Sequence, residues 1–139
     1  MKNKVILYSM CFLGVFSVGL TVNAQEECAN GAGIVVTGNV TGKTYCQSKS
    51  QPGSWWNAYS WCDAMQMQLV SLSDCGCSDS VSDCANSQCP EFKDALTQPV
   101  WTMNLDGSIN VRTINVNGSI GIVYRKDYGP NLWALCKNP

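Results

Sequence analysis

The distribution of cysteine constrains this chain more than any other feature. Nine of the 139 residues are cysteine and none is histidine. One of the nine, Cys11, lies in an N-terminal apolar run that we expect to be removed, and the others remain: Cys28, Cys46, Cys62, Cys75, Cys77, Cys84, Cys89 and Cys136. An even number of cysteines in a short exported chain predicts a disulfide framework formed in an oxidising compartment. The count alone leaves the connectivity open, because eight cysteines allow many pairings.

The first 24 residues have the composition of a secretory signal peptide. Lys2 and Lys4 form a basic start, Val5 to Leu20 is an apolar run, and Val22-Asn23-Ala24 has the small-x-small pattern of a cleavage site. The run is short for a membrane span, and no basic cluster follows it to stop transfer. The sequence therefore predicts a signal peptide over 1–24, one domain over 25–139, and a secreted or periplasmic protein with no membrane span in the mature chain.

Charge and the missing histidines argue against several classes of function. Without Lys2 and Lys4, seven basic residues stand against ten acidic ones, so the mature net charge is about −3. Nucleic acid is not an expected partner, since binding it requires a basic face. The missing histidine removes the commonest general base, the commonest zinc ligand and the triad mechanisms. A hydrolase with paired carboxylates is the weakest alternative. We expect neither an enzyme nor a cofactor.

Apolar periodicity predicts an α+β fold with an antiparallel sheet. Short strands over 34–36 and 44–47 predict a hairpin. Ser54 is a good N-cap, and the apolar positions that follow at helical spacing predict the main helix over about 55–66. Pro90 suits the first turn of a short second helix over about 91–96. Leu69 to Leu72 follows the main helix as a brief extended segment.

The C-terminal third is predicted to be β-structure. The expected strands cover 100–103, 109–116, 119–125 and 132–136. A phase slip in the alternation near Thr113 indicates a β-bulge. Asn117-Gly118 is a strong hairpin signal, because both residues tolerate positive φ.

The polar segment from Ser73 to Cys89 carries four cysteines. Its cysteines, Cys75, Cys77, Cys84 and Cys89, suit either two local disulfides or a four-thiolate zinc site. The oxidising compartment and the missing C-x-x-C spacing favour disulfides. Three acidic residues there, Asp74, Asp79 and Asp83, are oxygen donors of the kind calcium takes, but a solvated acidic loop is the favoured interpretation. We predict no metal site.

Aromatic and charged residues indicate where a ligand would bind. Trp55 lies on the apolar stripe of the main helix, whereas Trp56 lies off it and is expected to be exposed. Trp101 and Trp133 lie on strands and are expected in the core. Tyr124 to Tyr128 concentrates aromatic and charged groups at a strand end, where loops commonly carry binding. The predicted ligand-binding residues are Trp56, Tyr124, Arg125, Asp127, Tyr128 and Asn131.

Short motifs along most of the mature chain resemble those of the C-type lectin-like domain family, in its compact bacterial form. They are Trp55-x-x-Ala58-x-x-x-Cys62 followed by Leu69, then Trp101 opening a strand and Ala134-Leu135-Cys136 in the last strand. The segments Tyr45-Cys46-Gln47-Ser48 and Trp55-Trp56-Asn57-Ala58 also resemble bacterial members. The resemblance implies a disulfide between the helix cysteine and the last-strand cysteine, Cys62 and Cys136.

The chain departs from the family pattern where sugar-binding members hold calcium. The family's calcium ligands come from Glu-Pro-Asn or Gln-Pro-Asp on a long loop and from Trp-Asn-Asp on a strand. Here Gln51-Pro52-Gly53 precedes the helix, no Trp-Asn-Asp occurs, and few residues separate Trp101 from the next strand. We therefore expect a calcium-independent binding module for a protein or glycan ligand. The alternative is a disulfide-rich structural or surface-interaction protein with no small-molecule ligand.

Overall fold

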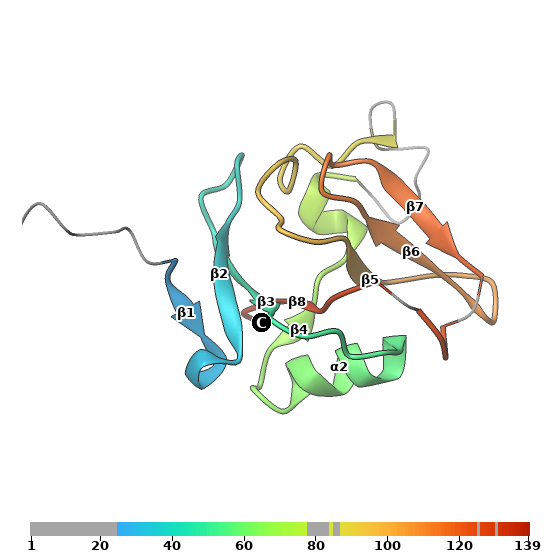
Figure 1. Cartoon of the computed structure of the whole chain (residues 1–139). Helices are drawn as coiled ribbons and strands as arrows, with labels where there is room; N and C mark the ends of the chain where they lie inside the picture. Colours follow the sequence, from blue (N-terminus) through green and yellow to red (C-terminus); the bar gives the residue numbers. More distant parts are fainter. Residues whose placement is uncertain (1–24, 78–83, 85–86, 125, 130) are drawn as a thin grey trace, which may run out of the picture.

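The computed structural model describes residues 25–77, 84, 87–124, 126–129 and 131–139, and the predicted signal peptide lies outside them. Within these ranges the fold is α+β, with two antiparallel sheets and one α-helix (Figure 1). The elements in chain order are β1 (Glu27–Cys28), η1 (Ala29–Gly31), β2 (Gly33–Thr37), β3 (Thr44–Ser48), α2 (Trp55–Asp63), β4 (Gln68–Leu69), η2 (Leu72–Cys75), β5 (Val100–Asp106), β6 (Asn110–Ile114), β7 (Ile120–Val123) and β8 (Leu135–Lys137). None of the described helices is both long and apolar enough to cross a membrane.

The larger sheet has five strands in the order β1-β2-β3-β8-β4. The predicted hairpin of β2 and β3 is confirmed, with Val35 opposite Cys46 in its register. β8 begins later than the predicted strand over 132–136, because pairing within the larger sheet starts at Leu135, whereas Trp133 forms an isolated bridge with Val100 of β5. It lies between β3 and β4, so that Cys136 is opposite Cys46 on one side and Leu69 on the other. The last strand in the chain therefore occupies an interior position in the sheet.

The smaller sheet has three strands in the order β5-β6-β7. β6 and β7 form the hairpin that Asn117-Gly118 predicts, and Gly118 has a φ of 84°. The predicted irregularity lies on the partner strand: between Trp101 and Leu105, β5 holds more residues than β6 does between the opposing positions. Two backbone hydrogen bonds join β5 to the segments that flank strands of the larger sheet. Met103 N donates to Val70 O (2.8 Å), just after β4, and Trp101 N donates to Trp133 O (3.0 Å), just before β8.

The main helix begins where the sequence predicts and ends earlier. The Ser54 hydroxyl accepts a hydrogen bond from Asn57 N (3.1 Å), as expected of an N-cap. α2 ends at Asp63 rather than near Gln66, because the chain turns there and Gln66 takes a φ of 59°. Trp55, Ala58 and Cys62 are its buried residues.

The predicted short helix over 91–96 is wrong, because this segment consists of turns. Asp94 has a φ of 57°, which a right-handed helix does not allow. Its N–H donates instead to Val116 O (2.7 Å), which ties the segment to the chain after β6. The apolar pattern that suggested a helix is still used for packing, since Phe92 and Leu96 are buried in the core.

Four disulfides hold the described chain together. Cys62 and Cys136 are bonded, with Cα atoms 5.5 Å apart, as the family resemblance implies. Cys75–Cys89 and Cys77–Cys84 are the two local bridges predicted for the polar segment. Cys28–Cys46 fixes the N-terminal arm to β3. The chain is thus stapled both across its fold and within its most polar segment.

A buried carboxylate connects the β2–β3 turn to the segment after Pro90. Glu91 is 1% exposed, and it accepts hydrogen bonds from Val40 N (3.1 Å), Thr41 N (3.1 Å), the Thr41 hydroxyl and the Tyr45 hydroxyl (3.3 Å). These bonds satisfy a group that is otherwise costly to bury. Desolvation first, and the nearby Glu91 charge second, raise the pKa of Tyr45 to about 12. Glu91 therefore has a structural role.

Candidate functional site

The predicted ligand-binding residues come from two segments that meet at the beginning of α2. Trp56 is the second residue of α2 and is 50% exposed, whereas its neighbour Trp55 is 6% exposed. Tyr124 and Tyr128 lie just after β7, and they are 69% and 63% exposed. Three large aromatic side chains thus stand in water although the core takes Trp55 and Trp101. The exposure of Trp56 and the burial of Trp55 and Trp101 are as predicted, while Trp133 is only partly buried.

Backbone hydrogen bonds fix the segment after β7 against the start of α2. Trp55 N donates to Lys126 O (2.9 Å), and Gly129 N donates to Gly53 O (3.2 Å). The Asn131 side-chain oxygen accepts from Gln51 Nε2 (3.2 Å). In Figure 1 the first turn of α2 lies beside the orange-red segment that follows β7. The structure therefore brings Trp56, Tyr124, Tyr128 and Asn131 to neighbouring parts of the molecule, from positions far apart in the sequence.

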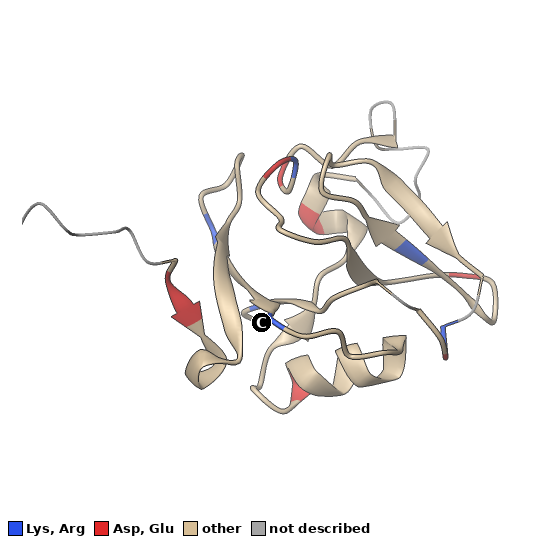
Figure 2. Ribbon diagram, in the orientation of Figure 1, with Lys and Arg blue, Asp and Glu red and all other residues tan. Residues whose placement is uncertain are grey.

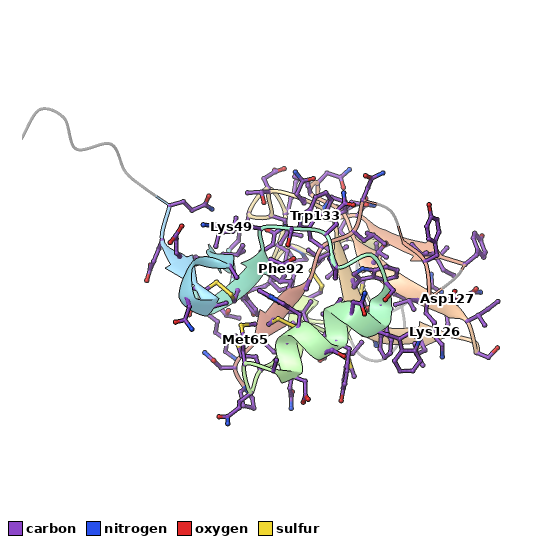
Figure 3. The ribbon with its side chains drawn as sticks, turned by 60° about the horizontal axis from the view of Figure 1, so that its bottom comes forward. Lys49, Met65, Phe92, Lys126, Asp127 and Trp133 are labelled. Atoms are coloured by element: carbon purple, nitrogen blue, oxygen red, sulfur yellow. A yellow bond between two sulfur atoms is a disulfide. The ribbon has the colours of Figure 1, made fainter. Side chains whose placement is uncertain are left out.

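A lysine side chain covers part of this region. Lys126 Nζ lies 5.0 Å from the ring centroid of Trp56, within the range of a cation–π contact. Trp55 packs edge-on against Trp56, with ring centroids 4.8 Å apart. Figure 3 places Lys126 and Asp127 beside the N-terminal end of α2. Lys126 is a contact residue that the sequence analysis omitted, although it lies inside the predicted segment. Asp127 is exposed, and Arg125 lies outside the described residues.

The position of the segment depends on a glycine packed against a buried tryptophan. A Cβ atom at Gly129 would overlap the ring of Trp101, which is fully buried. Only glycine lets the backbone approach the ring this closely. The Trp101 indole N–H has no hydrogen-bond partner among the described residues. The buried Trp101 ring thus packs against the backbone of the segment that carries Tyr128.

We name Trp56, Tyr124, Tyr128 and Lys126 the aromatic face. Other exposed apolar side chains lie on the elements around it, and sequence reasoning missed them. They are Tyr59 on α2, Met103 and Leu105 on β5, and Ile109 in the turn after β5. Ile109 O accepts a hydrogen bond from Lys126 N (2.8 Å), so this turn adjoins the aromatic face. Among the large apolar residues that are exposed in the described ranges, Val40 alone lies elsewhere, in the β2–β3 turn.

A pocket of about 370 Å³ opens at the other end of α2. We name it the α2 pocket, and its lining residues are Tyr59, Asp63, Met67, Gln68, Leu69, Ser71, Met103 and Lys137. The Tyr59 ring stacks on Trp55 with centroids 5.7 Å apart, which connects this pocket to the aromatic residues at the start of the helix. The helical spacing of Trp56, Tyr59 and Asp63 is the one sequence signal that points to this pocket.

The four cysteines of the polar segment are bonded to one another. Their sulfur atoms are joined in two disulfides, so they are not thiolates that zinc could use. Asp74, one of the acidic residues considered as a calcium ligand, pairs with Lys137 Nζ at 2.9 Å and accepts from Ser71 N at 2.8 Å. The other two, Asp79 and Asp83, lie outside the described residues.

Among the described residues, acidic and basic side chains are spread over several elements (Figure 2). Arg112 pairs with Asp106 (3.1 Å) and Lys49 pairs with Glu27, both at the surface. Recognition at the aromatic face would therefore depend on apolar contact and hydrogen bonds more than on long-range attraction.

Comparisons of this chain with protein-family models, with characterised proteins and with solved structures give no match.

Proposed function

We propose that this protein is an exported, calcium-independent binding module of the C-type-lectin-like kind, and that it recognises a glycan through the aromatic face. The observation that carries the proposal is the exposure of Trp56, Tyr124 and Tyr128 on two segments that are hydrogen-bonded to each other. Exposure of large aromatic side chains to water costs free energy, so several of them on adjoining segments favour a binding role.

The chemistry of the face suits a sugar. The C–H groups on one side of a pyranose ring form an apolar surface that packs on an aromatic ring, while its hydroxyl groups need polar partners. Tyr124 and Tyr128 offer rings and hydroxyls, and Lys126, Asp127 and Asn131 offer polar groups in the same short segment. The backbone bonds to Lys126 O and Gly53 O hold this segment in place, so little order has to be gained on binding.

Support for the lectin-like assignment comes from the connection between the helix and the last strand. The Cys62–Cys136 disulfide joins α2 to β8, in the relation that the family motifs imply. Export agrees with the four disulfides, which require an oxidising compartment. Calcium independence is proposed because the Gln51-Pro52-Gly53 segment lies before α2 and its glycine has no side-chain oxygen.

A glycan array, probed with the mature protein with and without a chelator, tests the proposal. We expect a defined set of glycans to bind, with signals unchanged by the chelator and lost in Trp56→Ala and Tyr128→Ala. Val40→Ala is the matched control, because Val40 is an exposed apolar residue outside the aromatic face. An empty array, or binding that both aromatic variants retain, would refute glycan recognition at this face and would favour the structural alternative.

A further inference from the structure

The α2 pocket has a mixed lining, in which apolar side chains stand beside polar ones and a carboxylate lies at the helix end. Its volume of about 370 Å³ lies within the usual size range of small-ligand pockets. Tyr59 is 40% exposed and Met103 is 38% exposed, and both line the pocket together with the half-buried Met67. The two thioethers form polarisable apolar surface for the carbon skeleton of a ligand, and the face of the Tyr59 ring can also accept a cation.

Asp63 occupies an unfavourable position for a carboxylate. It is the last residue of α2, where the helix dipole presents its negative end, and a negative side chain there is destabilising. No lysine or arginine of the described ranges forms an ion pair with it. Asp63 is exposed at the pocket wall, so its carboxylate is open to a ligand that enters the pocket.

Lys137, the cationic residue of the same pocket, already forms an ion pair with Asp74. Its Nζ lies 2.9 and 3.2 Å from the two carboxylate oxygens of Asp74, and that pair is largely shielded from water. The charge of Lys137 is therefore balanced by Asp74 rather than by Asp63. The pocket retains a net negative charge from Asp63 together with the carbonyl end of α2. A neutral or anionic ligand cannot form an ion pair with the Asp63 carboxylate, whereas a cationic ligand can.

We propose that the α2 pocket binds a protonated amine, and that the amine belongs to an amino sugar of the glycan. The second part rests on the proposed function. Trp56, Tyr59 and Asp63 follow one another along one side of α2, and the helical rise puts Trp56 and Asp63 about 10 Å apart. An oligosaccharide stacked on Trp56 would extend past Tyr59 and place its ammonium group against the Asp63 carboxylate. The amine selects the ligand, and the aromatic rings provide general sugar affinity.

Calorimetry with three β-1,4-linked tetrasaccharides tests the proposal: oligomers of glucosamine, of N-acetylglucosamine and of glucose. We expect the glucosamine oligomer to bind at least tenfold more tightly than the other two at neutral pH. Asp63→Asn should remove that advantage while keeping the weaker binding. Asp94→Asn is the matched control, because it removes one negative charge from an exposed position outside the pocket, at a φ that Asn also accepts.

A second measurement locates the amine independently. In a spectrum of methyl-labelled methionines, glucosamine monosaccharide should shift the Met67 and Met103 signals, and Asp63→Asn should abolish the shift. Equal affinity for the three oligomers, with all binding lost in Trp56→Ala, would overturn the amine site and leave the glycan proposal standing. Binding of none of the three, together with unmoved methionine signals, would overturn the amine site as well, whereas the array alone decides the glycan proposal.

Discussion

Removal of the Cys62–Cys136 bridge is the sharpest test of how this fold is held together. The perturbation is the double substitution C62A/C136A, which removes both sulfur atoms and so leaves no free thiol. Cys62 is 1% exposed and Cys136 is 0% exposed, and both belong to the core cluster that contains Trp55 and Trp101. The bridge joins α2 to β8, one of the interior strands of the larger sheet.

The magnitude follows from the length of chain that each bridge closes. The Cys62–Cys136 bridge spans a sequence separation of 74, whereas Cys77–Cys84 spans 7. In the chain-entropy model the first contributes about 4.5 kcal/mol to the free energy of unfolding and the second about 2.5 kcal/mol. Loss of buried sulfur at Cys62 and Cys136 adds a cavity cost that the loop bridge also bears, since Cys77 and Cys84 are 5% and 6% exposed. We therefore expect C62A/C136A to be less stable than C77A/C84A by about 2 kcal/mol.

Guanidinium denaturation of the two oxidised variants and the parent, followed by tryptophan fluorescence, measures this difference. The C77A/C84A variant should keep a cooperative transition with a moderately lowered midpoint. The C62A/C136A variant should have a much lower midpoint or lack a folded baseline, because a small domain has few kcal/mol to lose. Equal stability of the two variants, or greater damage from C77A/C84A, would refute the argument from loop length.

Three further outcomes are expected. Gly38→Ala should lower the free energy of unfolding by more than about 2 kcal/mol in a denaturation titration, because a Cβ there would overlap the Glu91 carboxylate; Gly76→Ala meets no neighbouring atom and bears only the strain of its positive φ, so it should cost less than Gly38→Ala, and the reverse order would contradict the overlap. Because the pKa of Tyr45 is raised to about 12, its contribution to stability is complete below pH 10 and is lost as the pH rises from 10 to 12; Tyr45→Phe should flatten this part of the stability profile, and an unchanged slope would contradict it. Millimolar calcium should leave the melting temperature unchanged, and a rise that a chelator reverses would show a calcium site.

Local signals in the sequence were sufficient to predict the start of the main helix, the two hairpins and the presence of two disulfides within the segment 73–89. Ser54 could be identified as an N-cap because capping depends on a few adjacent residues, and Asn117-Gly118 defines its turn in the same way. The 91–96 segment was mispredicted because Pro90 and the apolar spacing favour a helix, while the decisive interaction is the bond from Asp94 N to Val116 O. Such a tertiary contact overrides local propensity and leaves no trace in the segment itself.

The candidate site was predictable in part for the same reason. Trp56 could be predicted as exposed from its position off the apolar stripe, and Tyr124 and Tyr128 from their concentration at a strand end. The α2 pocket could not be predicted, because Tyr59 and Met103 come together only through the packing of α2 beside β5. The stack of Tyr59 on Trp55 also depends on side-chain orientation, which the helical repeat does not fix.

The interior position of β8 has a consequence for the order of events during folding. Residues 135–137 pair with β3 on one side and with β4 on the other, and they follow every other described strand in the chain. A chain that emerges with its N-terminus first can form the β2–β3 and β6–β7 hairpins early, but the five-stranded sheet stays split until β8 arrives. Pairings so distant in sequence form slowly. During that interval β3 and β4 present open edges, and Cys62 lacks its disulfide partner, because Cys136 lies in β8. Formation of the Cys62–Cys136 bridge is thus a late event that needs the whole chain, and a catalyst of disulfide exchange is of most use to this protein at the end of its synthesis.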